Sequence, residues 1–164
     1  MHSALQRPPA PDTAAASSSL TGILAHLDTV YGFALTLTGD PERAGALTER
    51  AFASVHDDLW STLGGHSLRD RLLARCVSEY TETVAARAPG SFATADPNVA
   101  GPDRLSALLR GLPWDERAAI ALVHQLGLSR SDAAAVLGTS VTEFRALLHH
   151  GRSVLFAAYR AAAR

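Results

Sequence analysis

Apolar residues recur at three- and four-residue steps along most of this chain, and no segment shows the strict apolar–polar alternation of a half-buried strand. Such spacing places the apolar side chains on one face of an α-helix. In the first segment, the apolar positions are Leu20, Ile23, Leu24, Leu27, Val30, Tyr31, Ala34 and Leu35. The pattern predicts an all-α fold in which the first helix packs through this stripe.

Two further helices are expected in the first half of the chain. Gly39 favours the left-handed conformation that ends a helix, and Asp40-Pro41 supplies a capping carboxylate and a first-turn proline. The second helix then buries the stripe Ala44, Leu47, Ala51, Phe52, Val55 and Leu59. The residues from Ser67 to Asp70 form a capping-box pattern for a third helix that runs to about Arg87. Its inward stripe is Leu68, Leu72, Leu73, Cys76, Val77, Tyr80 and Val84.

Composition changes twice along the chain, and these changes suggest the domain organisation. Residues 1–19 consist mainly of Pro, Ala and Ser, which predicts a disordered tail. Residues 88–102 contain three prolines and no helical stripe, which predicts a flexible linker. We therefore expect two small helical modules, the first at residues 20–87 and the second at residues 103–164. Because the linker offers no apolar stripe for packing, we also expect the two modules to move independently.

The second module contains the pattern of a helix-turn-helix. Ser129 to Asp132 and Ser140 to Glu143 are both capping boxes, and Gly138 ends the short helix between them. This geometry suits DNA, because the second helix can enter the major groove while the first braces it against the backbone. The alternative is an ordinary α-hairpin inside a small bundle. The candidate DNA-binding residues are Thr139, Thr142, Glu143, Arg145, Ala146, His149 and Arg152.

The charge distribution supports two modules with different partners. The formal net charge is only −1, and all fifteen Lys/Arg positions are Arg. Residues 20–87 contain six Arg and nine acidic residues, a net charge of −3, whereas residues 101–164 contain eight Arg and five acidic residues, a net charge of +3. Opposite signs in the two halves indicate different partners, and the basic half is the one suited to nucleic acid.

Several classes of protein are disfavoured by what the sequence lacks. It has neither an apolar run long enough to span a membrane nor a signal-peptide pattern at its start, so we expect a cytoplasmic protein with no membrane association. The single cysteine, Cys76, excludes an internal disulfide, and the seven histidines lack metal-ligand spacing. Asp57-Asp58 has no catalytic partner in the pattern. We therefore expect no cofactor, no metal site and no enzymatic activity.

Two sets of residues, one in each module, form a recognisable pattern. The second-module residues are Leu112-Pro113, Arg117, Gly127-Leu128-Ser129, Asp132-Ala133-Ala134, Val136-Leu137-Gly138, Ser140, Phe144-Arg145, Leu148-His149 and Arg152. The first-module residues are Tyr31, Ala34, Leu37-Thr38-Gly39-Asp40-Pro41-Glu42, Ala44, Leu47, Ala51 and Phe52. The second-module set resembles the C-terminal domain of extracytoplasmic-function (ECF) sigma factors, and the similarity is colinear across residues 105–156. The first-module set resembles the polymerase-binding helices of the same family, and Ala74-Arg75 is similar to the start of its −10-reading segment.

This resemblance implies a promoter-specificity subunit of RNA polymerase that acts in transcription initiation. The first module would dock on the clamp helices of core RNA polymerase and help to open the −10 region, while the second would bind the −35 element of promoter DNA. An anti-sigma factor is a further partner implied by the family. The polymerase-binding residues that the resemblance suggests are Arg43, Leu47, Glu49 and Arg50.

A second hypothesis remains open because of the third helix. Between Val77 and Val84 this helix carries Glu79 and Glu82 but no cation, and glutamates beside phosphates repel DNA. This favours a degenerate sigma-like regulator that binds polymerase or an anti-sigma factor without melting DNA.

Overall fold

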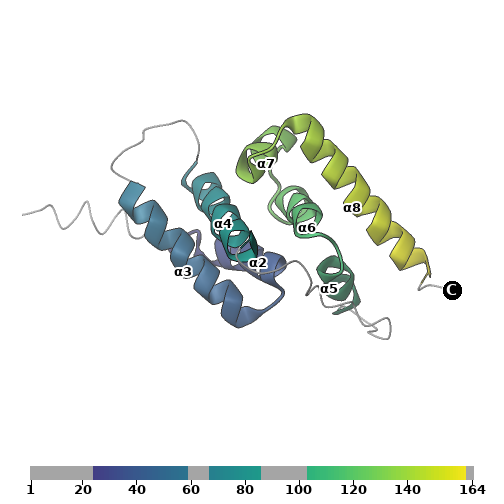
Figure 1. Cartoon of the computed structure of the whole chain (residues 1–164), viewed down its shortest axis with the longest axis horizontal. Coiled ribbons are helices and arrows are strands. Elements are labelled where there is room, and N and C mark those ends of the chain that lie inside the picture. The colour runs from purple at the N-terminus through teal and green to yellow at the C-terminus, as the bar shows by residue number, and fades with distance from the viewer. Residues whose placement is uncertain (1–23, 59–66, 86–102, 162–164) are drawn as a thin grey trace, which may run out of the picture.

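The computed structural model describes residues 24–58, 67–85 and 103–161, and within these ranges every regular element is a helix (Figure 1). The expected tail at 1–19 and linker at 88–102 lie outside the described residues. A first module comprises three helices and a second comprises the remainder. The elements are α2 (Leu27–Thr38), α3 (Pro41–Asp58), α4 (Leu68–Ala85), α5 (Asp103–Arg110), α6 (Trp114–Ile120), the short π-helix η1 (Ala121–Gln125), α7 (Arg130–Leu137) and α8 (Val141–Ala161).

The predicted helix ends of the first module are confirmed. Gly39 ends α2 with a φ of 67°, and its N–H donates to the carbonyl of Leu35. The carboxylate of Asp40 accepts from the N–H of Arg43 at 2.8 Å, and the hydroxyl of Ser67 accepts from the N–H of Asp70 at 3.2 Å. These bonds satisfy donors that the first turn of a helix leaves without an intrahelical partner.

The face that α2 buries overlaps the expected one in part. Val30 and Ala34 of the expected stripe are fully buried, but so are Phe33 and Leu37, which lie outside it. Leu24 and Tyr31 of the expected stripe are 60% and 37% exposed. This helix is apolar around most of its circumference, so spacing alone does not select the face that packs. The core of the first module is formed by Val30, Phe33, Ala34, Leu37, Ala44, Leu47, Ala51, Leu72, Leu73, Cys76 and Val77.

In the second module α8 packs mainly on α6. Phe144 and Leu148 of α8 are buried, and Gly151 lies so close to α6 that a Cβ atom there would meet Cδ1 of Ile120 at 3.0 Å. The helix of α6 changes to π geometry in η1, where the N–H of Leu126 donates to the carbonyl of Ala121 at 3.0 Å. Helix α6 and η1 therefore form one continuous helical segment that supports α8.

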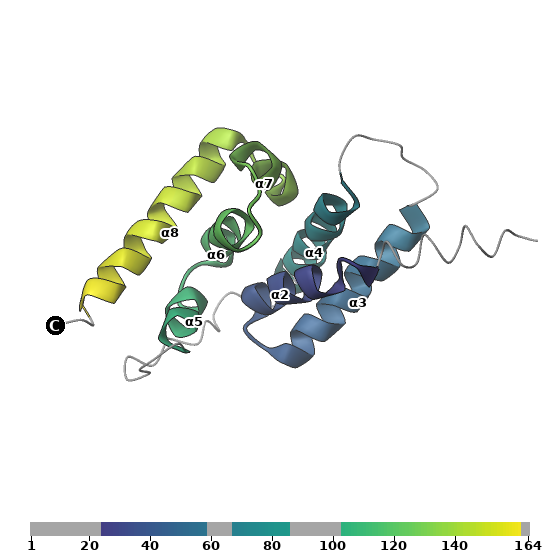
Figure 2. The ribbon, with the colours of Figure 1, turned by 180° about the vertical axis from the view of Figure 1, so that it is seen from behind.

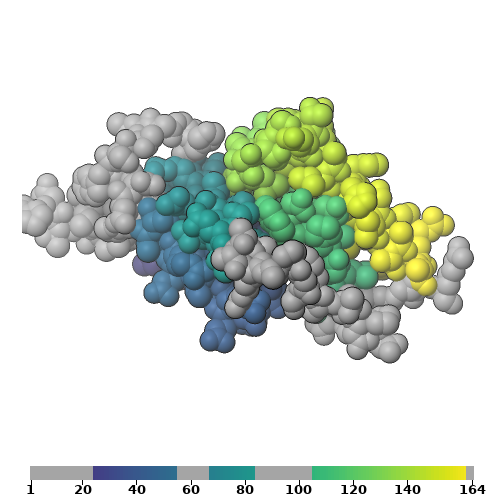
Figure 3. All heavy atoms as spheres, viewed as in Figure 1, coloured from purple at the N-terminus to yellow at the C-terminus, as the bar shows by residue number. Residues whose placement is uncertain are grey.

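The two modules pack against each other, which differs from the expectation that they move independently. One hydrophobic core runs through both, and α4 lies beside α7 while α2 lies beside α6 (Figures 1 and 2). On the face in Figure 3, atoms of α4 lie directly against those of the second module. Trp114 of α6 packs at an angle on Tyr80 of α4, with ring centroids 5.8 Å apart. Periodicity within each helix carries no signal for these contacts, because they join residues far apart in the sequence.

Candidate nucleic-acid interface

Helices α7 and α8 form the predicted helix-turn-helix. The hydroxyl of Ser129 accepts from the N–H of Asp132 at 3.2 Å and caps α7. Gly138 ends α7 in the left-handed conformation, with a φ of 65°, and the hydroxyl of Ser140 accepts from the N–H of Glu143 to cap α8. Both helix starts and the glycine between them therefore lie where the capping patterns predict.

The exposed face of α8 carries most of the candidate DNA-binding residues. Phe144 and Leu148 are buried where α8 packs in the core with α6 and α7, and this fixes the rotation of the helix. Thr142, Arg145, Ala146 and His149 are consequently exposed on other sides of α8. Arg130, at the first position of α7, is a further exposed cation of the helix-turn-helix that the candidate set did not include. Its only sequence signal was its place beside the N-cap residue Ser129.

Glu143 forms part of the turn itself. Its Oε2 atom accepts hydrogen bonds from the hydroxyls of Thr139 and Ser140, both at 2.8 Å, and from the N–H of Ser140 at 3.1 Å. The bonds from Ser140 and Thr139 lower the pKa of the Glu143 carboxyl below its ordinary value. The carboxylate therefore orients the start of α8. Thr139 and Glu143 stabilise the turn in addition to any contact that they make with DNA.

Two side chains of α8 hold the helix to its support. Nε of Arg152 donates to Nε2 of His124 on η1 at 2.9 Å, which requires that this histidine nitrogen carry no proton. Nδ1 of His150 lies 2.7 Å from Oε1 of Glu116 on α6. The guanidinium of Arg152 is therefore already hydrogen-bonded to His124, whereas Arg145 is an exposed cation of α8. Nothing in the sequence pattern indicated either pair.

The candidate polymerase-binding residues on α3 have different environments. Arg43 and Glu49 are exposed. Arg50 forms an ion pair with Glu79 of α4, with Nε and Oε2 3.4 Å apart. Leu47 is only 1% exposed and belongs to the core, so its assignment as a contact residue is wrong. Leu47 matches the family pattern because a leucine on the inward face of α3 is needed for packing against α2 and α4.

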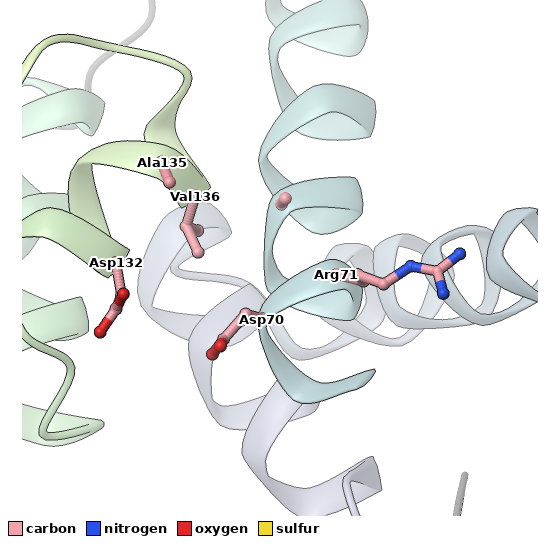
Figure 4. Close-up of a pocket in the computed structure, with 6 residues that line it drawn as sticks. Asp70, Arg71, Asp132, Ala135 and Val136 are labelled. Atoms are coloured by element: carbon pink, nitrogen blue, oxygen red, sulfur yellow. The ribbon is translucent and has the colours of Figure 1, made fainter. Parts of the chain in front are cut away.

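A shallow groove separates α4 from α7, but it has no arrangement of chemical groups typical of a catalytic or metal site. Its volume is about 100 Å³, and it is lined by Asp70, Arg71, Ala74, Asp132, Ala135 and Val136. In Figure 4 the carboxylates of Asp70 and Asp132 lie at the groove, whereas Arg71 extends away from it. Among the described residues no three His, Cys, Asp or Glu side chains are grouped so as to hold a metal ion. Burial raises the pKa of the Cys76 thiol to about 12, which keeps it in its unreactive form.

The fold and this interface define a two-module helical protein with a DNA-binding helix-turn-helix, and comparison with known proteins shows which proteins it resembles. Residues 103–155 match the family "Sigma-70, region 4". The chain is 31% identical over 147 residues to the ECF RNA polymerase sigma factor SigE of Mycolicibacterium smegmatis, an alignment that covers 79% of this chain and 57% of SigE. It is 28% identical to the ECF RNA polymerase sigma factor EcfG of Rhodopseudomonas palustris, across 82% of this chain and 81% of EcfG. The second module thus matches sigma-70 region 4, and the chain as a whole is similar to ECF sigma factors.

The fold agrees with that of a chain in a solved sigma factor complex. A chain in the co-crystal structure of the sigma factor RpoE with the anti-sigma factor NepR from Bartonella quintana superposes with a TM-score of 0.73 at 20% identity, covering 88% of this chain and 98% of that one. No helix within the described ranges is both long enough and apolar enough to cross a membrane.

Proposed function

We propose that this protein is a sigma factor that directs core RNA polymerase to specific promoters and acts in the cytoplasm, where the polymerase is found. The observation that carries the proposal is the region 4 helix-turn-helix, whose second helix exposes Arg145 and its neighbours on a rigid support. Such a helix reads base edges in the major groove, where arginine pairs with guanine and nearby cations neutralise phosphates. The first module supplies the polymerase-binding surface on α3, through Arg43, Glu49 and Arg50.

The ion pair between α3 and α4 also bears on the degenerate alternative. That hypothesis depends on repulsion between DNA and the glutamates of α4. Glu79 lies against the guanidinium of Arg50, which compensates its charge, while Glu82 remains exposed. The acidity of α4 is therefore smaller than the sequence suggests, and this supports a sigma factor that retains a role at the −10 element.

An anti-sigma partner is part of the same proposal. The structural neighbour RpoE was crystallised with the anti-sigma factor NepR. We propose that a small inhibitory protein of this kind binds the present chain and controls its access to polymerase.

The decisive experiment is transcription in vitro with purified core polymerase on a library of upstream DNA regions. A sigma factor produces specific start sites that are absent without it. If the protein binds core polymerase in a pull-down but starts no transcript on any template, the degenerate regulator becomes the better account. A variant with Arg145→Ala should lose the specific starts while still binding core polymerase.

A further inference from the structure

Helix α8 approaches its support most closely at Gly151. A Cβ atom at this position would lie 3.0 Å from Cδ1 of Ile120 and 3.2 Å from Cβ of Glu116. Glu116, Ile120 and His124 follow one another at four-residue steps along α6 and η1, so they lie on the same side of the support. The glycine therefore brings one turn of α8 against a single face of α6 and η1.

The residues before and after Gly151 bind this face at two separate points. Nδ1 of His150 lies 2.7 Å from Oε1 of Glu116, and Nε of Arg152 donates to Nε2 of His124 at 2.9 Å. Glu116 and His124 are about two helical turns apart, a distance of about 12 Å. Arg152 is therefore held at the end of the support that lies farther from Glu116.

The contact with His124 uses only one edge of the Arg152 guanidinium. Besides the bond from Nε, Nη2 of Arg152 lies 2.5 Å from the same Nε2 atom of His124. Two nitrogens on one edge of the planar group thus converge on a single acceptor. The guanidinium carries five N–H donors in a rigid fork, so the donors on Nη1 point away from that edge. Because Arg152 is exposed, these donors are available to a ligand.

A neutral histidine orients the guanidinium without cancelling its charge. In the first module, Arg50 is paired with the carboxylate of Glu79, which compensates its charge. Nε2 of His124 accepts from Arg152 only when the imidazole is neutral, so Arg152 keeps its full positive charge. A long side chain also loses conformational entropy when a ligand immobilises it. For Arg152 part of that loss has already occurred in the free protein.

The position of Arg152 along α8 suits a phosphate rather than a base. Arg145, the exposed cation proposed to read a base edge, lies nearly two turns before it on the same face, about 10 Å along the helix axis. The major groove is about 12 Å wide. A cation about 10 Å from the residue that reads a base therefore lies near the edge of the groove, where the phosphates run.

We propose that His124 is a positioning residue for DNA binding, which holds the guanidinium of Arg152 so that its Nη1 donors bind a backbone phosphate beside the major groove. The inference rests on the proposed sigma factor function. His124 acts through Arg152 and makes no contact with DNA itself. The phosphate receives a charge-assisted hydrogen bond from a side chain that is oriented before DNA arrives.

Double-mutant cycles in the full chain test this role. The probes are a fluorescein-labelled duplex of random sequence and a duplex that carries a promoter selected by transcription with the unmodified protein. Binding is measured by anisotropy at low ionic strength, at a pH above the range in which histidine takes up a proton. His124→Ala should weaken binding to both duplexes about two- to tenfold, because Arg152 then loses its restraint.

The background variants show which side chain His124 acts through. In an Arg152→Ala protein, His124→Ala should have no further effect. In an Arg145→Ala protein, which is the matched control, His124→Ala should keep its full effect. Additive losses for His124→Ala and Arg152→Ala overturn the proposal, because they would show that the two side chains act independently.

A conservative replacement separates positioning from a direct contact between His124 and phosphate. The amide oxygen of glutamine can lie close to the position of Nε2 and accepts a hydrogen bond, so His124→Gln should restore the affinity that His124→Ala loses. Equal losses for the two variants, with helicity intact by circular dichroism, overturn the proposal.

The free protein gives a second readout that needs no DNA. In NMR spectra the Nε–H of Arg152 should exchange slowly with water in the unmodified protein and in His124→Gln, and rapidly in His124→Ala. Rapid exchange in the unmodified protein overturns the positioning role. If the unmodified protein binds neither duplex, the proposed function fails, and the role of His124 in DNA binding fails with it. If it binds both duplexes and His124→Ala binds them equally well, only the positioning role fails.

Discussion

His150 and Glu116 approach each other across the second module, with Nδ1 of the imidazole 2.7 Å from Oε1 of the carboxylate. The histidine side chain is 68% exposed, whereas that of the glutamate is only 9% exposed. His150, an exposed residue of α8, thus covers the buried carboxylate of Glu116 on α6. The contact holds α8 at a fixed distance from α6.

Replacing this histidine should destabilise the second module. Oε2 of Glu116 already has no hydrogen-bond partner, so His150→Ala leaves the whole carboxylate buried and unpaired. Loss of a buried hydrogen-bonding partner costs about 1–3 kcal/mol, measured as the free energy of unfolding in urea. His149→Ala, at the exposed neighbouring position, is the matched control and should change stability little. Equal effects of the two variants would contradict this assignment.

Glu143 should stabilise the protein in a pH-dependent way. Its carboxyl has a lowered pKa in the folded state, so the charged form contributes stability above the unfolded-state pKa of about 4.3, and that contribution is lost as pH falls through the folded pKa. Glu143→Gln keeps an acceptor oxygen but removes the charge. The difference in unfolding free energy between the two proteins should therefore be present at neutral pH and disappear in acid. A difference that is independent of pH would contradict the linkage.

Charge reversal on the exposed surface of α3 should weaken polymerase binding without affecting the fold. Arg43→Glu and Glu49→Arg change exposed side chains, whereas reversal at Arg50 would also place like charges beside Glu79. We expect the double variant at 43 and 49 to lose core polymerase in a pull-down while its circular dichroism is unchanged. Leu47→Ala should instead cost about 2–5 kcal/mol of stability, because that side chain fills the core. If the double variant binds core polymerase as well as the unmodified protein does, the polymerase-binding site lies elsewhere on the protein.

Arg145 and Arg152 should contribute differently to DNA binding. Arg145→Ala should cost about 1–3 kcal/mol on the selected promoter and less on random DNA, if the side chain reads a base edge. Arg152→Ala should weaken binding to all sequences alike and should also release His124. With about four phosphates neutralised, log affinity should fall against log salt with a slope near −3.6. Fluorescence anisotropy with both duplexes measures these quantities, and equal losses for Arg145→Ala on promoter and random DNA would exclude base reading.

Local chemistry made part of this structure predictable from sequence. The caps at Asp40, Ser129 and Ser140 depend on residues within one turn of each other, so their spacing along the chain specifies the bonds. The helix-turn-helix follows from two such caps around Gly138.

Contacts between distant segments could not be predicted in the same way. Arg117 and Leu37 are 80 residues apart, and the acceptor is a main-chain carbonyl that every residue carries. Likewise the packed face of α2 is selected by what surrounds it. The helix contacts α3, α4 and α6, and Phe33 and Leu37 are buried while Leu24 remains exposed. Leu47 matched the family pattern, but a pattern match does not distinguish a contact residue from a core residue.

Gly39 meets two separate requirements with one hydrogen atom as its side chain. Its positive φ ends α2, and a Cβ atom there would come within 2.9 Å of Cδ of Arg110 in the other module. Asparagine tolerates the first requirement, because it adopts the left-handed conformation more readily than other residues, but it brings the Cβ atom that the second requirement excludes unless Arg110 moves. Glycine at this position therefore serves the docking of the two modules as well as the end of the helix.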